Sequence, residues 1–222
     1  MSFEEYLKPG KFIDSDHPVV IEYAKVHVGT GTTDIEKALS LFYAVRDGIR
    51  YNPYMKIESP TAYRASDAVK SGEGWCVPKA ALMAACLRIN GIPARPGYAD
   101  VKNHLASKHL LDLMGTDIFP WHSYCEVYLD GKWVKSTPSF NLSLCEKFGL
   151  KPLDFDGKND SLFHEFDQAG NKHMDYILER GTYADVPMDE MLVTFKEMYL
   201  PEYFESIDGD LYAEADAERA AD

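Results

Sequence analysis

Cys76 is the residue whose neighbours in the sequence best suit nucleophilic chemistry. It follows a turn that contains Gly72 and Gly74 and directly precedes a predicted helix over residues 77–90. Free backbone N–H groups and the helix dipole at such a position favour a thiolate, which predicts a lowered pKa for this thiol. The alternative is a small buried hydrophobic residue, because free cysteines are often buried.

A cysteine nucleophile needs an imidazole that accepts its proton and later returns one to the leaving group, and His122 is the candidate. Among the seven histidines, it stands in a clear alternating pattern that predicts a strand over residues 121–129. Asp130-Gly131 is a strong hairpin signal, and residues 132–135 are the returning strand. The alternative is a structural histidine, which is common on strands.

The register of this hairpin predicts which groups orient the imidazole. Counting back from the turn places Ser139 opposite His122, with Thr137 and Asn141 as diagonal neighbours on the same face. We therefore expect the orienting group at one of these three positions.

The remaining elements are predicted from local signals. Thr33 and Glu36 form a capping box that predicts an amphipathic helix over residues 34–48. The other expectations are a helix over 19–25, a short helix capped by Ser66, a strand over 94–99, a loop over 102–118, a loop-rich segment over 145–181 and a last helix capped by Asp189. Cys86 and Cys125 are expected to fill the core.

Composition narrows the classes of protein that fit. The chain has 222 residues and a net charge of −13, which opposes binding to nucleic acid or to an anionic membrane surface. It lacks an apolar run long enough for a membrane helix, and its acidic start is unlike a secretory signal. Four cysteines without metal-site spacing indicate free thiols and a cytoplasmic protein.

Several ordered pieces of the sequence together resemble the transglutaminase-like superfamily of papain-fold cysteine enzymes, over roughly residues 34–141. They are Gly74-Trp75-Cys76, the helix end Leu87-Arg88-Ile89-Asn90-Gly91-Ile92-Pro93-Ala94-Arg95, the strand Trp121-His122-Ser123-Tyr124-Cys125-Glu126-Val127-Tyr128-Leu129, and Gly131-Lys132-Trp133. The resemblance implies an α+β papain-like fold, in which a helix bearing the nucleophile at its N-terminus packs on an antiparallel sheet.

The resemblance also implies a Cys-His-Asp triad, in which Cys76 matches the nucleophile and His122 the base. The third position departs from the family, because Thr137 stands where the family has aspartate. A threonine hydroxyl accepts a hydrogen bond from the imidazole but carries no charge that stabilises imidazolium. Asn141 is the second candidate, since an amide orients the histidine in papain-type sites.

These observations predict thiol-dependent acyl transfer or hydrolysis on a peptide, protein or small amide substrate. The alternative is a transglutaminase-like binding or scaffold module that lost turnover with the carboxylate. We expect one domain over residues 1–207, with an extension over 145–207 and a disordered acidic tail over 208–222. No cofactor and no metal are expected: the acidic turn at 154–160 lacks the bidentate glutamate of a calcium loop, and nothing places His164, Asp167, His173 and Asp175 on one face.

Overall fold

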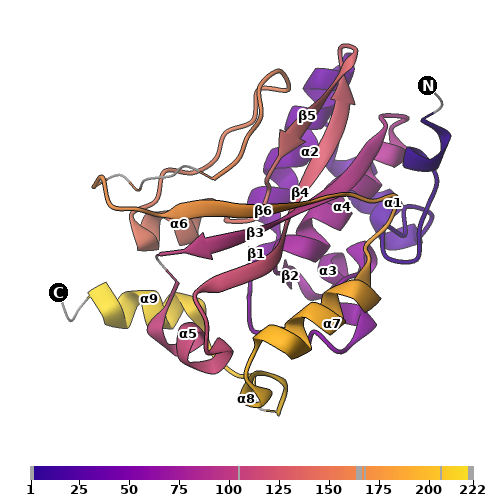
Figure 1. Cartoon of the computed structure of the whole chain (residues 1–222). Helices are drawn as coiled ribbons and strands as arrows, with labels where there is room; N and C mark the ends of the chain where they lie inside the picture. The colour runs from indigo at the N-terminus through magenta and orange to yellow at the C-terminus, as the bar shows by residue number, and fades with distance from the viewer. Residues whose placement is uncertain (1–2, 105, 164–166, 168, 206, 220–222) are drawn as a thin grey trace.

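The computed structural model describes residues 3–104, 106–163, 167, 169–205 and 207–219 (Figure 1). Its centre is a four-stranded antiparallel sheet in the order β5-β4-β3-β6. The strands are β3 (Ala94–Asn103), β4 (Ile118–Leu129), β5 (Lys132–Ser136) and β6 (Met174–Thr182), and a small parallel pair is formed by β1 (Arg50–Tyr51) and β2 (Glu73–Gly74).

Helices cover the sheet and extend beyond one end of it. Helices α1 to α4 lie together behind the sheet in the view of Figure 1, whereas α7, α8 and α9 follow β6 and lie at its lower side. The helices are α1 (Pro18–His27), α2 (Asp34–Gly48), α3 (Ala65–Ser71), α4 (Cys76–Ile89), α5 (Lys108–Met114), α6 (Leu142–Phe148), α7 (Met188–Met198), α8 (Pro201–Glu205) and α9 (Leu211–Arg219), with the 3-10 turns η1 (Glu4–Tyr6) and η2 (Pro60–Ala62). The predicted α+β class, with a helix set against an antiparallel sheet, is confirmed.

Helix α4 is the central helix of the core. Every residue from Cys76 to Arg88 is buried, between β4 on one side and α1, α2 and α3 on the others. The run is rich in alanine and leucine and has no polar face, as expected of a helix surrounded by protein. Its buried Lys79 donates hydrogen bonds to the carbonyl oxygens of Arg46 (2.9 Å) and Ile49, and so ties α4 to the end of α2.

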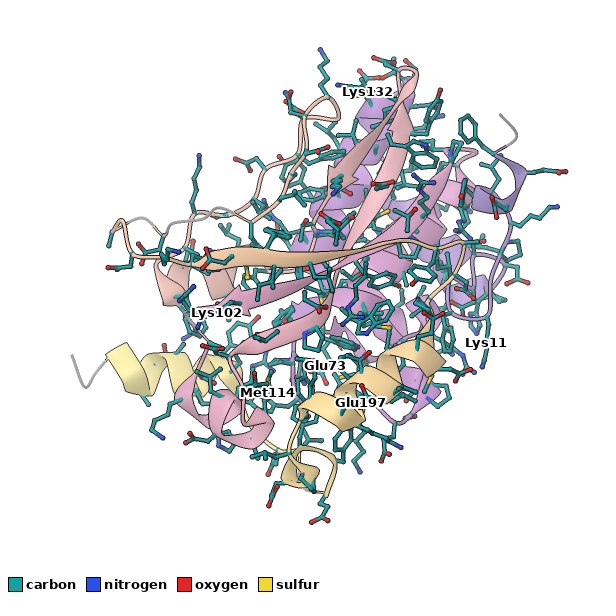
Figure 2. The ribbon with its side chains drawn as sticks, viewed as in Figure 1. Lys11, Glu73, Lys102, Met114, Lys132 and Glu197 are labelled. Carbon is teal, nitrogen blue, oxygen red and sulfur yellow. The ribbon has the colours of Figure 1, made fainter. Side chains whose placement is uncertain are left out.

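The tip of the β4–β5 hairpin lies outside the core, and its Lys132 is exposed (Figure 2).

Local signals in the sequence give the correct structure around α2 and the hairpin. The Thr33–Glu36 capping box is present at the start of α2. Strands β4 and β5 pair with Leu129 opposite Lys132, and Asp130 and Gly131 have φ values of 47° and 86°, as a type I′ turn requires. Both predictions are confirmed.

Two predicted caps are wrong. Helix α3 begins at Ala65, so Ser66 lies inside it, and its backbone N–H donates instead to the carboxylate of Asp14 (3.0 Å). Helix α7 begins at Met188, so Asp189 lies in its first turn, where a carboxylate still complements the helix dipole.

The segments predicted as loops contain further elements. Helix α5 lies within 102–118, while α6 begins just before the 145–181 segment and β6 lies near its end. The sequence does not predict strand β6, because its register with β3 shifts at two places. These shifts break the alternation of side chains that identifies a strand.

The prediction of a disordered tail is wrong for residues 211–219, which form α9. Its Glu214 accepts hydrogen bonds from the hydroxyl groups of Tyr54 (2.5 Å) and Ser107 (2.7 Å). The acidic composition of the segment predicts disorder, and composition gives no information about these distant partners.

Candidate active site

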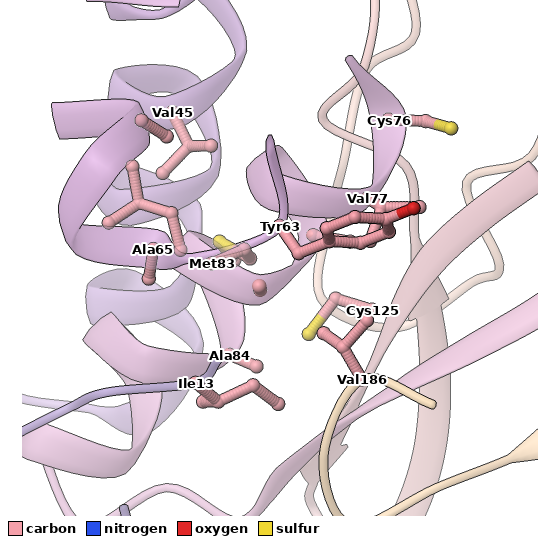
Figure 3. Close-up of a cluster of buried hydrophobic side chains, with 14 of the residues drawn as sticks. Ile13, Val45, Tyr63, Ala65, Cys76, Val77, Met83, Ala84, Cys125 and Val186 are labelled. Atoms are coloured by element: carbon pink, nitrogen blue, oxygen red, sulfur yellow. The ribbon is translucent and has the colours of Figure 1, made fainter. Parts of the chain in front are cut away.

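Cys76 is the first residue of α4, and Trp75 is its N-cap. Its side chain lies at the edge of the apolar cluster, and the sulfur points away from Tyr63 and Cys125 (Figure 3). Burial raises the pKa of this thiol to about 12, and it outweighs the backbone hydrogen bonding of Ser123, Val77 and Cys76 itself, which acts to lower the pKa. The predicted lowering of the pKa is therefore wrong: the helix start supplies the expected donors, and desolvation outweighs them.

The part of β4 near the Cys76 sulfur is the part that no longer pairs with β5. The last pair of the β4–β5 ladder is Cys125 with Ser136, so β5 does not reach Ser123. The N–H of Ser123 instead contacts the Cys76 sulfur, one residue along the chain from His122.

His122 lies on β4 opposite Ala99 and is 6% exposed. Its Nε2 atom is buried with no hydrogen-bond partner among the described residues, and its ring centroid is 5.1 Å from that of Phe163. Burial, and secondly the nearby His173, lowers the pKa of His122 to about 3. The imidazole is therefore neutral at pH 7 and can accept a proton, while the Cys76 thiol is neutral as well.

Cys76 and His122 line one cavity of about 70 Å³. No Asp, Glu, Lys or Arg belongs to the described lining, which is mostly apolar and aromatic. A polar wall is supplied by the thiol, the imidazole groups of His122 and His173, and a few other groups. Members of the apolar wall include Ile57, Leu110, Met114, Phe119, Phe140 and Leu211.

An aromatic row from the extension covers the start of α4. We use this name for Phe195, Tyr199 and Tyr203: Phe195 stacks on Tyr199 with a centroid separation of 5.3 Å, and Tyr199 contacts the tilted ring of Tyr203 at 4.9 Å. Phe195 in turn contacts Trp75 edge to face at 6.0 Å. Burial raises the pKa of Tyr199 and of Tyr203; smaller contributions come from Tyr203 and then Cys76 for Tyr199, and from Cys76 for Tyr203. The sequence predicts a last helix in this region, but it does not show that Phe195 and Tyr199 lie in one cavity with the thiol.

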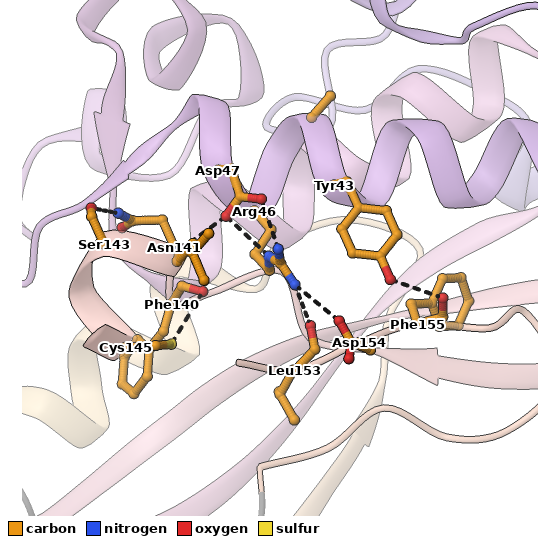
Figure 4. Close-up of polar contacts among 12 residues, drawn as sticks. Tyr43, Arg46, Asp47, Phe140, Asn141, Ser143, Cys145, Leu153, Asp154 and Phe155 are labelled. Carbon is orange, nitrogen blue, oxygen red and sulfur yellow. Dashed lines mark hydrogen bonds and ion pairs between the residues drawn. The ribbon is translucent and has the colours of Figure 1, made fainter. Parts of the chain in front are cut away.

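Thr137 and Asn141 have other partners than the imidazole. The hydroxyl of Thr137 donates to the carbonyl oxygen of Ser161 (2.8 Å). The Asn141 amide oxygen accepts from the N–H of Tyr51 (3.0 Å) and from the Tyr212 hydroxyl (2.7 Å). Its amide nitrogen bonds to Ser143, as Figure 4 shows. The β4–β5 ladder ends before Pro138, so the register that set Ser139 opposite His122 does not continue that far. A role for Thr137 as the third member stays a prediction.

The acidic positions considered for metals are engaged otherwise. Asp156 accepts hydrogen bonds from the N–H groups of Lys158 (2.8 Å) and Asn159 (2.7 Å), as in a solvated turn. Asp175 pairs with His104 at 2.8 Å. His164 lies outside the described residues, and within them no three His, Cys, Asp or Glu side chains gather as metal ligands would.

The comparisons with known proteins agree with the fold. A family model described as the transglutaminase-like superfamily matches residues 21–138, more than half of the chain, and the protein belongs to that superfamily. The match ends before the aromatic row and β6.

Two solved structures are similar to this chain. One is "a Putative Cysteine Protease from Cytophaga hutchinsonii", with 19% identity, a TM-score of 0.45, and coverage of 80% of this chain and 53% of that one. The other is "a putative protease from Parabacteroides distasonis", with 16% identity, a TM-score of 0.41, and coverage of 62% and 25%. The chain thus spans about half of the first protein and a quarter of the second. None of the curated proteins compared matches it.

The described helices include none with both the length and the apolar composition needed to cross a bilayer.

Proposed function

We propose that this protein is a thiol-dependent enzyme that transfers or hydrolyses acyl groups of amide or peptide substrates, with Cys76 as nucleophile and His122 as base. The observation that carries the proposal is that both side chains line one cavity, with the N–H of Ser123 on the sulfur. A cytoplasmic location is part of the same proposal, in keeping with four cysteines that are free thiols.

The proposed reaction begins from a neutral thiol and a neutral imidazole. As the sulfur attacks the carbonyl carbon, the thiol proton passes to His122, and the carbonyl π electrons move to oxygen. Backbone N–H groups at the start of α4 are the candidate donors to that oxyanion. The imidazolium then protonates the leaving amine as the C–N bond breaks. The thioester is finally cleaved by water or by an amine, whose proton His122 accepts and returns to the sulfur.

The lining of the cavity supports an uncharged apolar group next to the scissile bond. A charged side chain there would lose its water without gaining a counter-ion, because the described lining carries none.

A binding module without turnover is the second candidate, and one observation favours it. The residue at the family's aspartate position is Thr137, whose hydroxyl donates to the carbonyl oxygen of Ser161. A threonine also carries no charge that would stabilise imidazolium. Against this, a binding module needs neither Cys76 nor His122, and the chain has both.

Alkylation by iodoacetamide, followed residue by residue with mass spectrometry from pH 5 to 10, separates the two functions. At every pH at which Cys76 reacts, we expect it to react at least about tenfold more slowly in the His122→Ala variant, since a general base is worth that much or more. Cys86, buried in the core, is the internal control for global unfolding. Labelling of Cys76 only above pH 8, with the same rate in His122→Ala, would establish the binding module instead.

A further inference from the structure

The residue before His122 has an unusual backbone conformation. Trp121 has φ = 61°, in the left-handed region that a bulky side chain rarely adopts. The register between β3 and β4 explains where this occurs: Ala99 pairs with His122 and Val101 with Phe119, so Asp100 alone faces two residues of β4. Trp121 is thus part of a β-bulge, a device that redirects the side chains that follow it.

Asp100 holds this bulge. Its carboxylate, on a side chain 9% exposed, accepts the backbone N–H of Trp121 (3.0 Å). The same carboxylate accepts two hydrogen bonds from the guanidinium of Arg180, from Nε (2.5 Å) and Nη2 (2.8 Å). That guanidinium also lies over the Trp121 ring, 4.6 Å from its centroid. One ion pair therefore fixes both the backbone and the ring of Trp121.

Arg180 lies on β6, the strand that pairs with the edge of β3 opposite to β4. Ala99 pairs with Glu179 and Tyr98 with Gly181, so Arg180 is itself an extra residue in β6. The indole N–H of Trp121 is held by the extension as well, because it donates to the hydroxyl of Thr194 in α7 (2.9 Å). These contacts lie beyond residue 138, where the family match ends.

Without the bulge, the side chains of β4 would change face. Successive residues of a strand point to opposite sides, so removing one extra residue moves those on one side of it to the other face of the sheet. A left-handed Trp121 is costly by itself and persists only when its surroundings hold it.

We propose that Asp100 and Arg180 are positioning residues that set the direction of the His122 ring by holding Trp121 in the bulge. The proposal rests on the proposed function for its effect on reactivity, but the placement of the ring can be measured without it.

The chain offers a matched control for this ion pair. Arg95 and Glu126 bridge β3 and β4 at 2.8 Å, whereas Asp100 and Arg180 bridge β3 and β6; the side-chain exposures are 20% and 11% for Arg95 and Glu126 and 21% and 9% for Arg180 and Asp100. Arg95 likewise lies over a tryptophan ring, that of Trp133, at 4.1 Å. Arg180→Met and Arg95→Met therefore remove equivalent interactions from the same sheet, near and far from His122.

The test measures iodoacetamide alkylation of Cys76 in both variants, each with and without His122→Ala. We expect Arg180→Met to slow alkylation about tenfold when His122 is present, as a small misplacement of a catalytic group does, and to have no effect in the His122→Ala background. Arg95→Met should leave the rate unchanged. Arg180→Lys, which keeps the charge but not the two-donor geometry, is the second variant should Arg180→Met not fold, with a smaller loss expected.

NMR spectra of the His122 ring and of the Trp121 backbone amide provide the independent readout. Both signals should shift in Arg180→Met and stay in place in Arg95→Met. If wild-type alkylation does not depend on His122, the proposed function fails, and these shifts still decide the positioning role. Unchanged signals and unchanged alkylation in a folded Arg180 variant would overturn the inference.

Discussion

Acidification from pH 7.5 to pH 5.0 should destabilise this protein through His122. The pKa of the imidazole is about 3 in the folded protein, because burial disfavours the charged ring, and about 6.5 in an unfolded chain. Between these values the unfolded chain binds a proton that the folded protein does not. The stabilisation is complete above pH 6.5 and is lost as the pH falls toward 3.

The size of the effect follows from the distance between pH 5.0 and the unfolded pKa. That distance is about 1.5 pH units, and each unit corresponds to about 1.4 kcal/mol, so the folded state should lose about 2 kcal/mol. The folded ring is still neutral at pH 5.0, so the whole distance to the unfolded pKa counts. With a urea dependence of about 2 kcal/mol per molar, the unfolding midpoint should move by about 1 M.

Urea unfolding of the wild type and of His122→Gln at the two pH values isolates this contribution. Glutamine does not titrate, so the wild type should lose about 2 kcal/mol more than the variant between pH 7.5 and 5.0. Carboxylates that titrate in the same range are common to both proteins and cancel in the comparison. Equal losses would refute the account of His122 as a buried imidazole without a counter-charge.

Three further changes test neighbouring parts of the site and core. Thr137→Asp should raise the pKa of His122 and speed iodoacetamide alkylation about tenfold at pH 7, since a carboxylate stabilises imidazolium; an unmoved ring titration by NMR would contradict this. Burial lowers the pKa of Lys79 to about 7, so above pH 7 the unfolded chain binds a proton that the folded protein does not. From pH 7 to 9 the free energy of unfolding should therefore rise by about 2 kcal/mol more in the wild type than in Lys79→Met. An equal change in the two proteins, measured by urea unfolding, would contradict this prediction. Phe195→Ala should cost about 3–5 kcal/mol and speed alkylation of Cys76 by admitting water, and slower alkylation in a folded variant would argue against a covering role.

The parts of the fold that the sequence predicts are those with local causes. The Thr33–Glu36 capping box, the Asp130-Gly131 turn and Gly91 after α4 act within a few residues, and each lies where it was predicted. The register of the hairpin follows from its turn and holds as far as Ser136, where Pro138 approaches and the pairing ends.

The environment of the site could not be predicted, because distant segments create it. A helix start predicts a thiolate at Cys76, whereas burial sets the pKa of the thiol, in a cavity that is lined in part by residues more than a hundred positions away. In the same way, the strain at Trp121 and its support by Arg180 depend on a sheet edge that has no regular alternation in the sequence. The sequence shows that position 137 holds a threonine and not an aspartate. It does not show that the Thr137 hydroxyl bonds to the carbonyl oxygen of Ser161.

The proposed nucleophile and the proposed base each lie near a different element of the extension. Its aromatic row lines the same cavity as Cys76, whose thiol is kept protonated by burial, while Arg180, on β6, bonds the Asp100 carboxylate that holds Trp121 beside His122. The two actions come from different elements, so they are separable: water that enters when the row is displaced would lower the pKa of the thiol without disturbing the ion pair at Asp100. Under the proposed function, a substrate that displaces the row would therefore meet a more reactive sulfur without disturbing His122. It follows that Phe195→Ala and Arg180→Met, although both alter the extension, should change the alkylation rate of Cys76 in opposite directions.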